Sequence, residues 1–280
     1  MSHASAALRA DRVTRRFGDQ VVFQELSLEV RRSEIVSLIG PSGCGKSTLL
    51  RVIAGLERGD AGRVEIDGRE LRGPDRAVGF MFQEPRLLPW LTVRDNIVLG
   101  LPRAGRRDAG GLVDRLLAQV QLEGAAPLWP RQLSGGMAQR VALARCLAIE
   151  PSVVVLDEPC SAVDALTRMV LQDLLLAIAR RTGLTMLLVT HDLDEALYLS
   201  DRVVVMTGRP ATLTETVTVA LPRPRNRRAP ELAAWRGDLL EALDLTGAAS
   251  PTWHEIHGHD LDPRYPNHPP PTPSFSSGLP

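Results

Sequence analysis

The sequence has few cysteines, no excess of either charge and no long apolar run, and each absence narrows the class of protein. The three cysteines, Cys44, Cys146 and Cys160, have no metal-ligand spacing, so we expect a reducing compartment, the cytoplasm. Basic and acidic side chains number 33 each, which argues against broad binding of nucleic acid. No apolar run approaches the roughly 20 residues of a membrane span, and the N-terminus has no signal-peptide pattern. Hydrophobic residues make up 44% of the 280 residues, enough for a sizeable core.

A complete phosphate-binding loop, Gly-x-x-x-x-Gly-Lys-Ser, is the most specific motif that is present. The apolar residues 35–39 before it predict a buried strand, and residues 49–54 after it have helical spacing. Strand, loop and helix are the context that the motif requires, so a chance glycine turn is rejected. The backbone N–H groups should cradle phosphates, Lys46 should reach the β- and γ-phosphates, and the Ser47 hydroxyl should ligate Mg²⁺. The loop residues are Gly40, Pro41, Ser42, Gly43, Cys44, Gly45, Lys46, Ser47 and Thr48.

Two adjacent carboxylates, Asp157 and Glu158, follow a continuous apolar run at residues 153–156. Such a run predicts a strand at the centre of a parallel sheet. Carboxylates at the end of a buried strand are costly unless they have a function. Asp157 fits the second Mg²⁺ anchor of a phosphate-loop enzyme, and Glu158 is placed to polarise water.

Gln83 is the last residue of a predicted strand at 78–83, and His191 lies just after a predicted strand at 185–189. Each has a structural alternative, since a glutamine at a strand end is usually solvated and a lone histidine is more often structural. Beside a bound nucleotide, Gln83 would ligate Mg²⁺ or orient water, and His191 would hydrogen-bond the γ-phosphate.

Ser134, Gly135 and Gly136 precede a predicted helix at residues 141–147. A serine-glycine-glycine start is a second candidate anion site, because helix N-termini present free N–H groups. The alternative is an ordinary N-cap with Ser134 as the capping residue. This stretch by itself favours the cap.

The N-terminal region contains two apolar bursts, residues 21–23 and 26–30, that we expect to be antiparallel strands of a small sheet. Phe17 precedes them. Its ring either packs in the core or stacks on a nucleobase, and the second interpretation gains weight only beside a phosphate loop.

The C-terminal part predicts a strand at residues 201–206 and a further pair of strands at 213–219. The arginines that follow are expected to form a solvated linker, and residues 231–245 have the pattern of an amphipathic helix. The last 30 or so residues are rich in Pro, Ser and His and should be disordered; three histidines there are weak metal candidates. These residues are Arg223, Arg225, Arg227 and Arg228 in the linker, and His254, His257 and His259 in the tail.

The phosphate loop, Gln83, the Ser-Gly-Gly start, the Asp-Glu pair and His191 stand in an order that resembles the nucleotide-binding subunits of ABC transporters, over residues 12–225. The resemblance implies that Phe17 stacks on adenine and that Asp164 belongs to a D-loop at 161–165. It also implies a signature loop that acts on a partner chain: Leu133, Ser134, Gly135, Gly136, Met137 and Gln139. Val163 stands where leucine is usual, and Met137 where glutamine is common, but neither change removes a catalytic group.

Residues 40–47, 81–90 and 221–225 are most similar to importers of the nitrate, taurine and aliphatic sulfonate group. The resemblance implies an ATPase that uses ATP and Mg²⁺, forms a homodimer around two ATP molecules and docks on an integral membrane permease. It would lie peripherally on the cytoplasmic face of the membrane, served indirectly by an extracytoplasmic substrate-binding protein. The transported compound would be a small oxyanion, aliphatic sulfonate first. A soluble ABC-type ATPase and a phosphate-loop kinase are the alternatives.

The expected fold is therefore an α/β P-loop NTPase with a RecA-like parallel-sheet core, an antiparallel β subdomain and an inserted α-helical subdomain. We expect the ATP-binding domain at residues 8–225, with the helical subdomain at about 88–148. A C-terminal helix at 226–248 and a disordered tail at 249–280 would follow.

Overall fold

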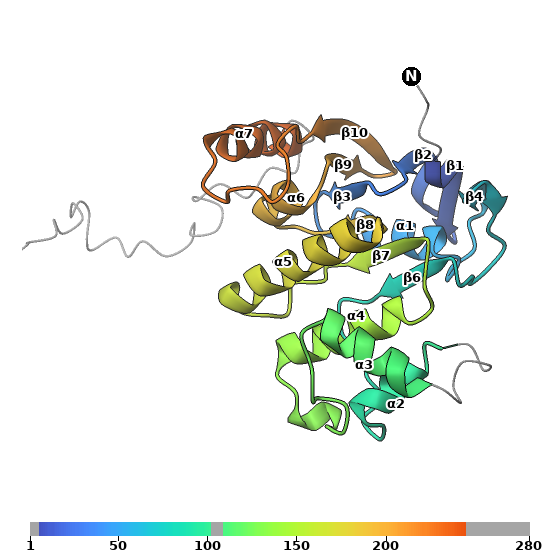
Figure 1. Ribbon diagram of the computed structural model, residues 1–280. Helices are drawn as coiled ribbons and strands as arrows, with labels where there is room; N and C mark the ends of the chain where they lie inside the picture. The colour runs from blue at the N-terminus through green and yellow to red at the C-terminus, as the bar shows by residue number, and fades with distance from the viewer. Residues whose placement is uncertain (1–5, 102–108, 245–280) are drawn as a thin grey trace, which may run out of the picture.

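The computed structural model describes residues 6–101 and 109–244, and the strands in these ranges form one ten-stranded sheet (Figure 1). The strand order is β5-β4-β1-β2-β10-β9-β3-β8-β7-β6. The last five strands in this order are parallel to one another. They are β9 (Arg202–Gly208), β3 (Ile35–Ile39), β8 (Thr185–Val189), β7 (Val153–Asp157) and β6 (Val78–Met81).

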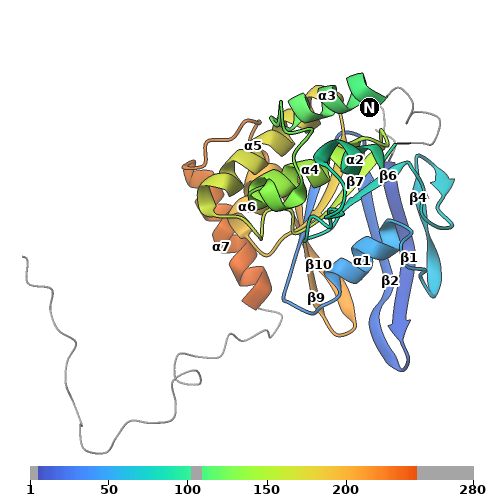
Figure 2. The same ribbon diagram turned by 90° about the horizontal axis from the view of Figure 1, so that it is seen from below.

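The inner strands β3, β7 and β8 are buried at every position because helices cover both faces of the sheet. Along β7, Val153 and Val155 contact the core that contains α1 (Lys46–Ile53), whereas Val154 and Leu156 contact the core that contains α5 (Ala165–Thr182). Helix α6 (Leu193–Leu199) lies on the α5 side, and α1 lies on the opposite face (Figure 2). Burial on both faces explains why these strands appear in the sequence as continuous apolar runs.

The two apolar bursts at 21–23 and 26–30 are one strand, so their prediction as separate strands was wrong. Both lie in β2 (Gln20–Arg31), whose antiparallel partner is β1 (Ala6–Phe17). Glu25 interrupts the alternation: its φ is 50°, the register shifts beside it, and its N–H donates to Thr14 Oγ1 at 3.0 Å. A bulge therefore accounts for the break that looked like a turn. Strands β4 (Ala61–Ile66) and β5 (Arg69–Glu70) extend this antiparallel half.

The stretch at 213–219 is likewise a single strand for most of its length. It lies in β10 (Ala211–Thr218), which pairs antiparallel with β9 through a short turn. Ala211 of β10 also pairs with Phe23 of β2, and this pairing joins the antiparallel half of the sheet to the parallel half.

Among the described residues, three α-helices lie between β6 and β7 in the chain and group together below the sheet in Figure 1. They are α2 (Val93–Val98), α3 (Ala109–Gln119) and α4 (Gly135–Leu147), and they share an apolar core with α5. The predicted fold class is confirmed as a whole. Within the described ranges, no helix combines the length and the apolarity that crossing a membrane would need.

The C-terminal helix, α7 (Pro230–Asp244), is amphipathic as predicted. Leu232 and Leu239 are buried, and Trp235 and Leu243 pack against the same cluster, which includes residues of α6 and β9. The predicted tail at 249–280, with its three histidines, lies outside the described residues.

The arginine-rich segment before α7 is not a solvated linker, so that prediction was wrong. Arg225 is only 5% exposed and donates to the carbonyls of Leu197, Tyr198, Val219 and Leu221 at 2.8–3.1 Å. Burial lowers the pKa of Arg225 to about 10. Two of its acceptors are carbonyls at the end of α6, which have no partner within the helix. The fork of five N–H donors makes arginine suited to this task, and sequence spacing gives no sign of it.

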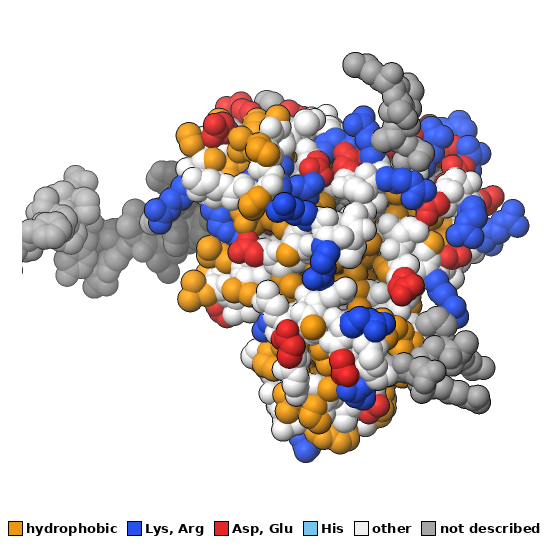
Figure 3. Space-filling view, viewed as in Figure 1, with side chains coloured by type: hydrophobic (Ala, Val, Ile, Leu, Met, Phe, Trp, Pro, Cys, Tyr) orange, Lys and Arg blue, Asp and Glu red, His pale blue; other side chains and the backbone are white. Residues whose placement is uncertain are grey.

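Charges on the surface balance locally as well as in total. On the face drawn in Figure 3, basic and acidic side chains lie interspersed, including over the antiparallel strands. On the antiparallel strands, Arg9 pairs with Glu29 at 2.7 Å and Arg63 pairs with Asp11 at 3.1 Å.

We predict that Arg225→Ala lowers the free energy of unfolding by about 2–4 kcal/mol, because several buried carbonyls lose a charged donor. Urea denaturation followed by circular dichroism measures the change. The matched control is Arg228→Ala, which removes an exposed arginine of the same segment and should change stability by less than about 0.5 kcal/mol. Equal stabilities of the two variants would show that the Arg225 contacts contribute little.

Candidate functional site

The phosphate loop at residues 40–48 joins β3 to α1 and lines a cavity of about 380 Å³. This is a volume typical of small-ligand sites. The end of β1, the start of β2, the residue directly after β7 and the β9–β10 turn complete the walls. The lining residues are Phe17, Gln20, Val21, Val22, Ser42, Gly43, Cys44, Gly45, Lys46, Ser47, Thr48, Glu158 and Arg209.

Close packing of the loop on β9 and β2 explains two of its glycines. A Cβ on Gly40 would lie 2.0 Å from the Met206 carbonyl oxygen, and one on Gly45, whose φ is 108°, would lie 2.5 Å from Val22 Cγ1. The Cys44 thiol donates to the same Met206 carbonyl at 3.5 Å. Contacts with β9 and β2 therefore hold the loop in its place beside the cavity.

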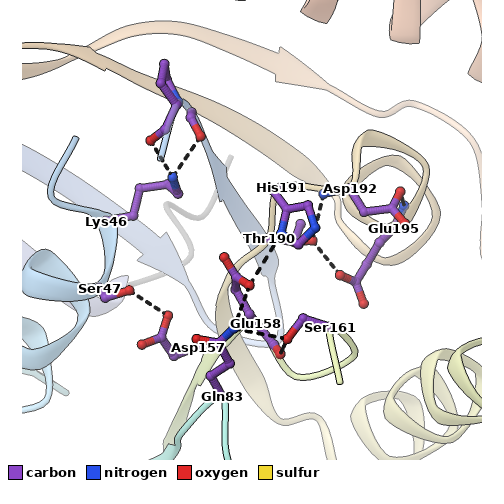
Figure 4. Close-up of polar contacts among 12 residues, drawn as sticks. Lys46, Ser47, Gln83, Asp157, Glu158, Ser161, Thr190, His191, Asp192 and Glu195 are labelled. Atoms are coloured by element: carbon purple, nitrogen blue, oxygen red, sulfur yellow. Dashed lines mark hydrogen bonds and ion pairs between the residues drawn. The ribbon is translucent and has the colours of Figure 1, made fainter. Parts of the chain in front are cut away.

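Lys46 is the only lysine in the chain, and its side chain is 7% exposed. Its Nζ donates to the Gly40 and Pro41 carbonyls at 2.7 and 2.8 Å, as Figure 4 shows. The ammonium group is thus held directly beside the loop N–H groups. An anion seated on those groups would come within its reach.

Asp157 and Ser47 meet although 110 positions separate them. Ser47 Oγ donates to Asp157 Oδ1 at 2.9 Å (Figure 4). Burial raises the pKa of Asp157, and the bond from Ser47 opposes that shift. A buried carboxylate next to a hydroxyl oxygen is the kind of hard oxygen pair that Mg²⁺ prefers.

Glu158 brings the remaining predicted catalytic residues together. Its Oε2 accepts from Gln83 Nε2 at 3.2 Å and lies 3.3 Å from His191 Nδ1. Its backbone φ is 47°, a conformation that costs energy in a non-glycine residue, and its N–H donates to the Val189 carbonyl of β8 at 3.0 Å. The neighbouring strand therefore helps to hold the backbone that points this carboxylate into the cavity.

The segment that carries His191 is anchored by a buried polar network. Thr190 Oγ1 donates to Glu195 Oε2 at 2.5 Å, and Gln172 Nε2 donates to Glu195 Oε1 at 3.4 Å. Arg227 then donates to Gln172 Oε1 at 2.6 Å and stacks on the Tyr198 ring at 3.5 Å. Contacts thus run without a break from the histidine segment to the chain that leads into α7.

The Ser134 cap favoured by the sequence is confirmed. Ser134 Oγ accepts from the Met137 N–H at 3.2 Å at the start of α4. A Cβ on Gly136 would lie 2.2 Å from Thr167 Cγ2, so this glycine allows α4 to approach α5. Ser134 and Gly135 are exposed, and neither lines the phosphate-loop cavity.

Gln139 is predicted to act on a partner chain with the other signature residues, but the structure places its side chain inside its own subunit. Its side chain is fully buried, and its Nε2 donates to the Gln83 carbonyl at 2.8 Å. Leu133 and Met137 are partly buried against the helical core. Gln139 therefore holds the Gln83 segment to α4 from within the subunit.

Asp164 and Phe17 are both exposed, but of the two only Phe17 lines the cavity. Asp164 caps α5, since its carboxylate accepts from the N–H groups of Leu166 and Thr167, both at 3.1 Å. Phe17 is 49% exposed and lines the cavity, with the Arg15 guanidinium 4.4 Å from its ring centre. The core-packing alternative for Phe17 is therefore wrong.

Arg209 is a cavity residue that the sequence did not reveal. It lies in the β9–β10 turn, more than 160 positions from the phosphate loop, and no motif marks it. Only the pairing of β9 beside β3 brings it to the site.

Comparison with known proteins places this site in a family. The ABC transporter family profile matches residues 23–161. The chain is 54% identical over 247 residues to the aliphatic sulfonates import ATP-binding protein SsuB 1 of Xanthomonas axonopodis pv. citri, covering 86% of this chain and 97% of that protein. It is 46% identical over 227 residues to the SsuB protein of Bacillus licheniformis, covering 80% of this chain and 88% of that protein.

Solved structures agree with the sequence comparison. The dimeric post-hydrolysis state of the ATP-binding cassette MJ0796, bound to ADP and Pi, is 29% identical with a TM-score of 0.65, covering 77% of this chain and 100% of that chain. The structure of cbiO1 from Clostridium perfringens shows the shared fold. It is 23% identical with a TM-score of 0.69, and the match covers 86% of this chain and 95% of that chain. The extent of identity to these relatives shows that the chain belongs to the ABC transporter family.

Proposed function

We propose that this chain is the ATP-hydrolysing subunit of an importer for a small oxyanion, with aliphatic sulfonates as the first candidate and nitrate or taurine next. Curated relatives at 54% and 52% identity are named aliphatic sulfonates import ATP-binding proteins. These names favour an importer over the soluble ABC-type ATPase. The observation that carries the ATPase assignment is the meeting of Lys46, Ser47 and Glu158 at a single cavity.

ATP fits this cavity with its base toward Phe17 and its phosphates on the loop. The exposed ring at one edge offers a stacking surface, and the loop N–H groups offer an anion site. When ATP binds, the Lys46 ammonium group would donate to the β- and γ-phosphates instead of the two loop carbonyls. The phosphates are the stronger acceptors because they carry a full negative charge.

The oxygen donors beside the loop fit Mg²⁺. Ser47 and Asp157 would hold the ion, with Gln83 as a further oxygen ligand. When bound, Mg²⁺ neutralises charge on the phosphates. Its presence would also keep Asp157 ionised against the burial that raises its pKa.

Glu158 is the proposed general base and His191 the group that contacts the γ-phosphate. The carboxylate lies at the cavity wall, accepts a hydrogen bond from Gln83 and lies beside the His191 ring. Because Gln83 touches Glu158 on one side and is tied through its carbonyl to α4 on the other, it can report the state of the site to the helical cluster.

A second copy of the chain would complete each site. Ser134 and Gly135 are exposed at a helix N-terminus but lie outside their own subunit's cavity. In a head-to-tail pair they would supply N–H groups to the γ-phosphate of the partner. The solved MJ0796 cassette is a dimer, which supports the same arrangement here.

The segment after Gln83 is the proposed docking surface for the membrane permease. Arg145 donates to the Pro85 and Arg86 carbonyls at 2.7 and 2.8 Å, so α4 holds this segment in place. Leu87 packs inward, whereas Trp90 is 67% exposed. A large exposed aromatic on a clamped loop suits a partner surface. The subunit would then act peripherally at the cytoplasmic face, with the substrate-binding protein contacting the permease from the other side.

We predict that Glu158→Gln lowers the rate of ATP hydrolysis by about 10²–10⁴-fold while ATP binding is kept. The amide retains the shape but cannot accept the proton, and one negative charge near the triphosphate is lost. The arrested variant should therefore accumulate as a dimer with ATP and remain monomeric with ADP, measured by size-exclusion chromatography. Glu123→Gln, at an exposed position, is the control and should hydrolyse ATP normally. Near-normal turnover of the Glu158 variant would remove it from the role of base.

We predict that Lys46→Ala weakens ATP binding by about 100-fold or more, because a charged donor to the phosphates is lost. Titration with fluorescent ATP at fixed Mg²⁺ measures this. Since Lys46 is the only lysine, an amine-acylating reagent followed by mass spectrometry provides a second readout in the unmodified protein. Saturating MgATP should protect Lys46 from acylation. Unprotected acylation together with unchanged affinity would place the phosphates elsewhere.

We predict that Trp90→Ser leaves the ATPase rate of the isolated subunit unchanged and lowers its assembly with the permease by about 30-fold, the loss typical of a central aromatic anchor. Co-purification and uptake by the assembled transporter measure the effect. Leu240→Ser, which changes an exposed apolar residue of α7, is the control. Normal uptake by the Trp90 variant would contradict this docking surface.

A further inference from the structure

The β9–β10 turn is attached on both sides to the walls of the nucleotide cavity. Gly208 pairs with Ala211, which leaves Arg209 and Pro210 as a two-residue turn. On one side β9 runs parallel to β3, the strand that leads into the phosphate loop. On the other side Ala211 pairs with Phe23 of β2, the strand that also lines the cavity through Gln20, Val21 and Val22. The turn therefore has a fixed place beside the site.

Backbone contacts hold the turn close to the phosphate loop. The Met206 carbonyl, three residues before Arg209, accepts a hydrogen bond from the Cys44 thiol. The same carbonyl lies so close to position 40 that only a glycine fits there. Beyond this contact, the Arg209 side chain extends over the loop. Its Nη2 lies 3.5 Å from the position that a Cβ on Gly43 would take.

Arg209 supplies a positive charge that its own subunit does not neutralise. Among the residues that line the cavity, Lys46 and Arg209 are the cations. Lys46 donates to two loop carbonyls. Arg209 is exposed, and within residues 6–101 and 109–244 no ion pair includes the Arg209 guanidinium. A cation left exposed above an anion-binding loop is available to a ligand.

We propose that Arg209 is a second cationic contact to the phosphate chain of the nucleotide, made from the turn side of the loop. The guanidinium lies above Gly43, one of the residues whose N–H groups cradle the phosphates. Its planar fork matches two phosphate oxygens at once, which a lysine cannot do. The contact rests on the proposed nucleotide site and adds to it a residue that the phosphate loop motif does not include.

The test compares Arg209→Ala and Arg209→Lys in the full chain by titration with fluorescent ATP and Mg²⁺. Arg209→Ala should weaken binding by about 5- to 30-fold, the range for a charge-assisted contact in a partly exposed site. Arg209→Lys should recover part of the loss, and added KCl should narrow the gap between the wild type and Arg209→Ala. Arg58→Ala, which removes an exposed arginine away from the cavity, is the matched control and should bind as the wild type.

Two further comparisons show whether the Arg209 contact or the nucleotide site itself is wrong. Binding of GTP should fall by the same factor as binding of ATP, because both carry the same phosphates; a loss confined to one of them would assign Arg209 to the base and overturn the phosphate contact. Unchanged affinity in Arg209→Ala, with strong loss in Lys46→Ala, would overturn the Arg209 contact alone. Unchanged affinity in both variants would overturn the nucleotide site itself. Thermal unfolding checks each variant, and Arg209→Gln replaces Arg209→Ala if that variant is unstable.

Discussion

Parallel pairing of β3 with β8 and of β8 with β7 is the constraint on which the site depends. Leu38 pairs with Val189, and Val189 pairs with Asp157, so the carboxyl ends of three strands lie at one level. All three strands are buried on both faces, which fixes their register, because a slip of one residue would exchange the two faces of each strand. The 2.9 Å contact between Ser47 and Asp157 follows from that register. So does the bond from Glu158 to Val189, which sets the direction of the proposed base.

Polar side chains connect this edge to the rest of the subunit at a few defined points. Gln139 and Arg145 donate to backbone carbonyls of the segment after β6, so three hydrogen bonds join α4 to the Gln83 segment. On the other side, Glu195 and Gln172 link the His191 segment to Arg227. Buried polar groups of this kind are costly when unpaired, which makes each connection stiff. The proposed catalytic residues therefore sit between two rigid attachments, one to the helical cluster and one to the C-terminal segment.

The signature stretch has two kinds of residue. Gly136 and Gln139 are buried and serve the packing of α4 against α5 and the Gln83 segment. Ser134 and Gly135 are exposed, and only they are free to act on another molecule. A single short motif can therefore combine a structural requirement with a partner contact. Position on the helix separates the two, since residues one turn apart share a face.

The sequence alone determined the phosphate loop, the buried parallel strands and the polar residues that follow them, because each depends on a local pattern of residues and on nothing distant. It also predicted the Ser134 cap and the amphipathic face of α7 for the same reason. The local pattern gave a wrong prediction for β2, because the bulge at Glu25 resembles the end of a strand. It also gave a wrong prediction for the arginine segment, because the acceptors of Arg225 lie at the end of α6. Local patterns missed Arg209 entirely. Tertiary structure decided these points, since burial, carbonyl capping and access to the cavity arise only when segments far apart in the chain meet across the sheet.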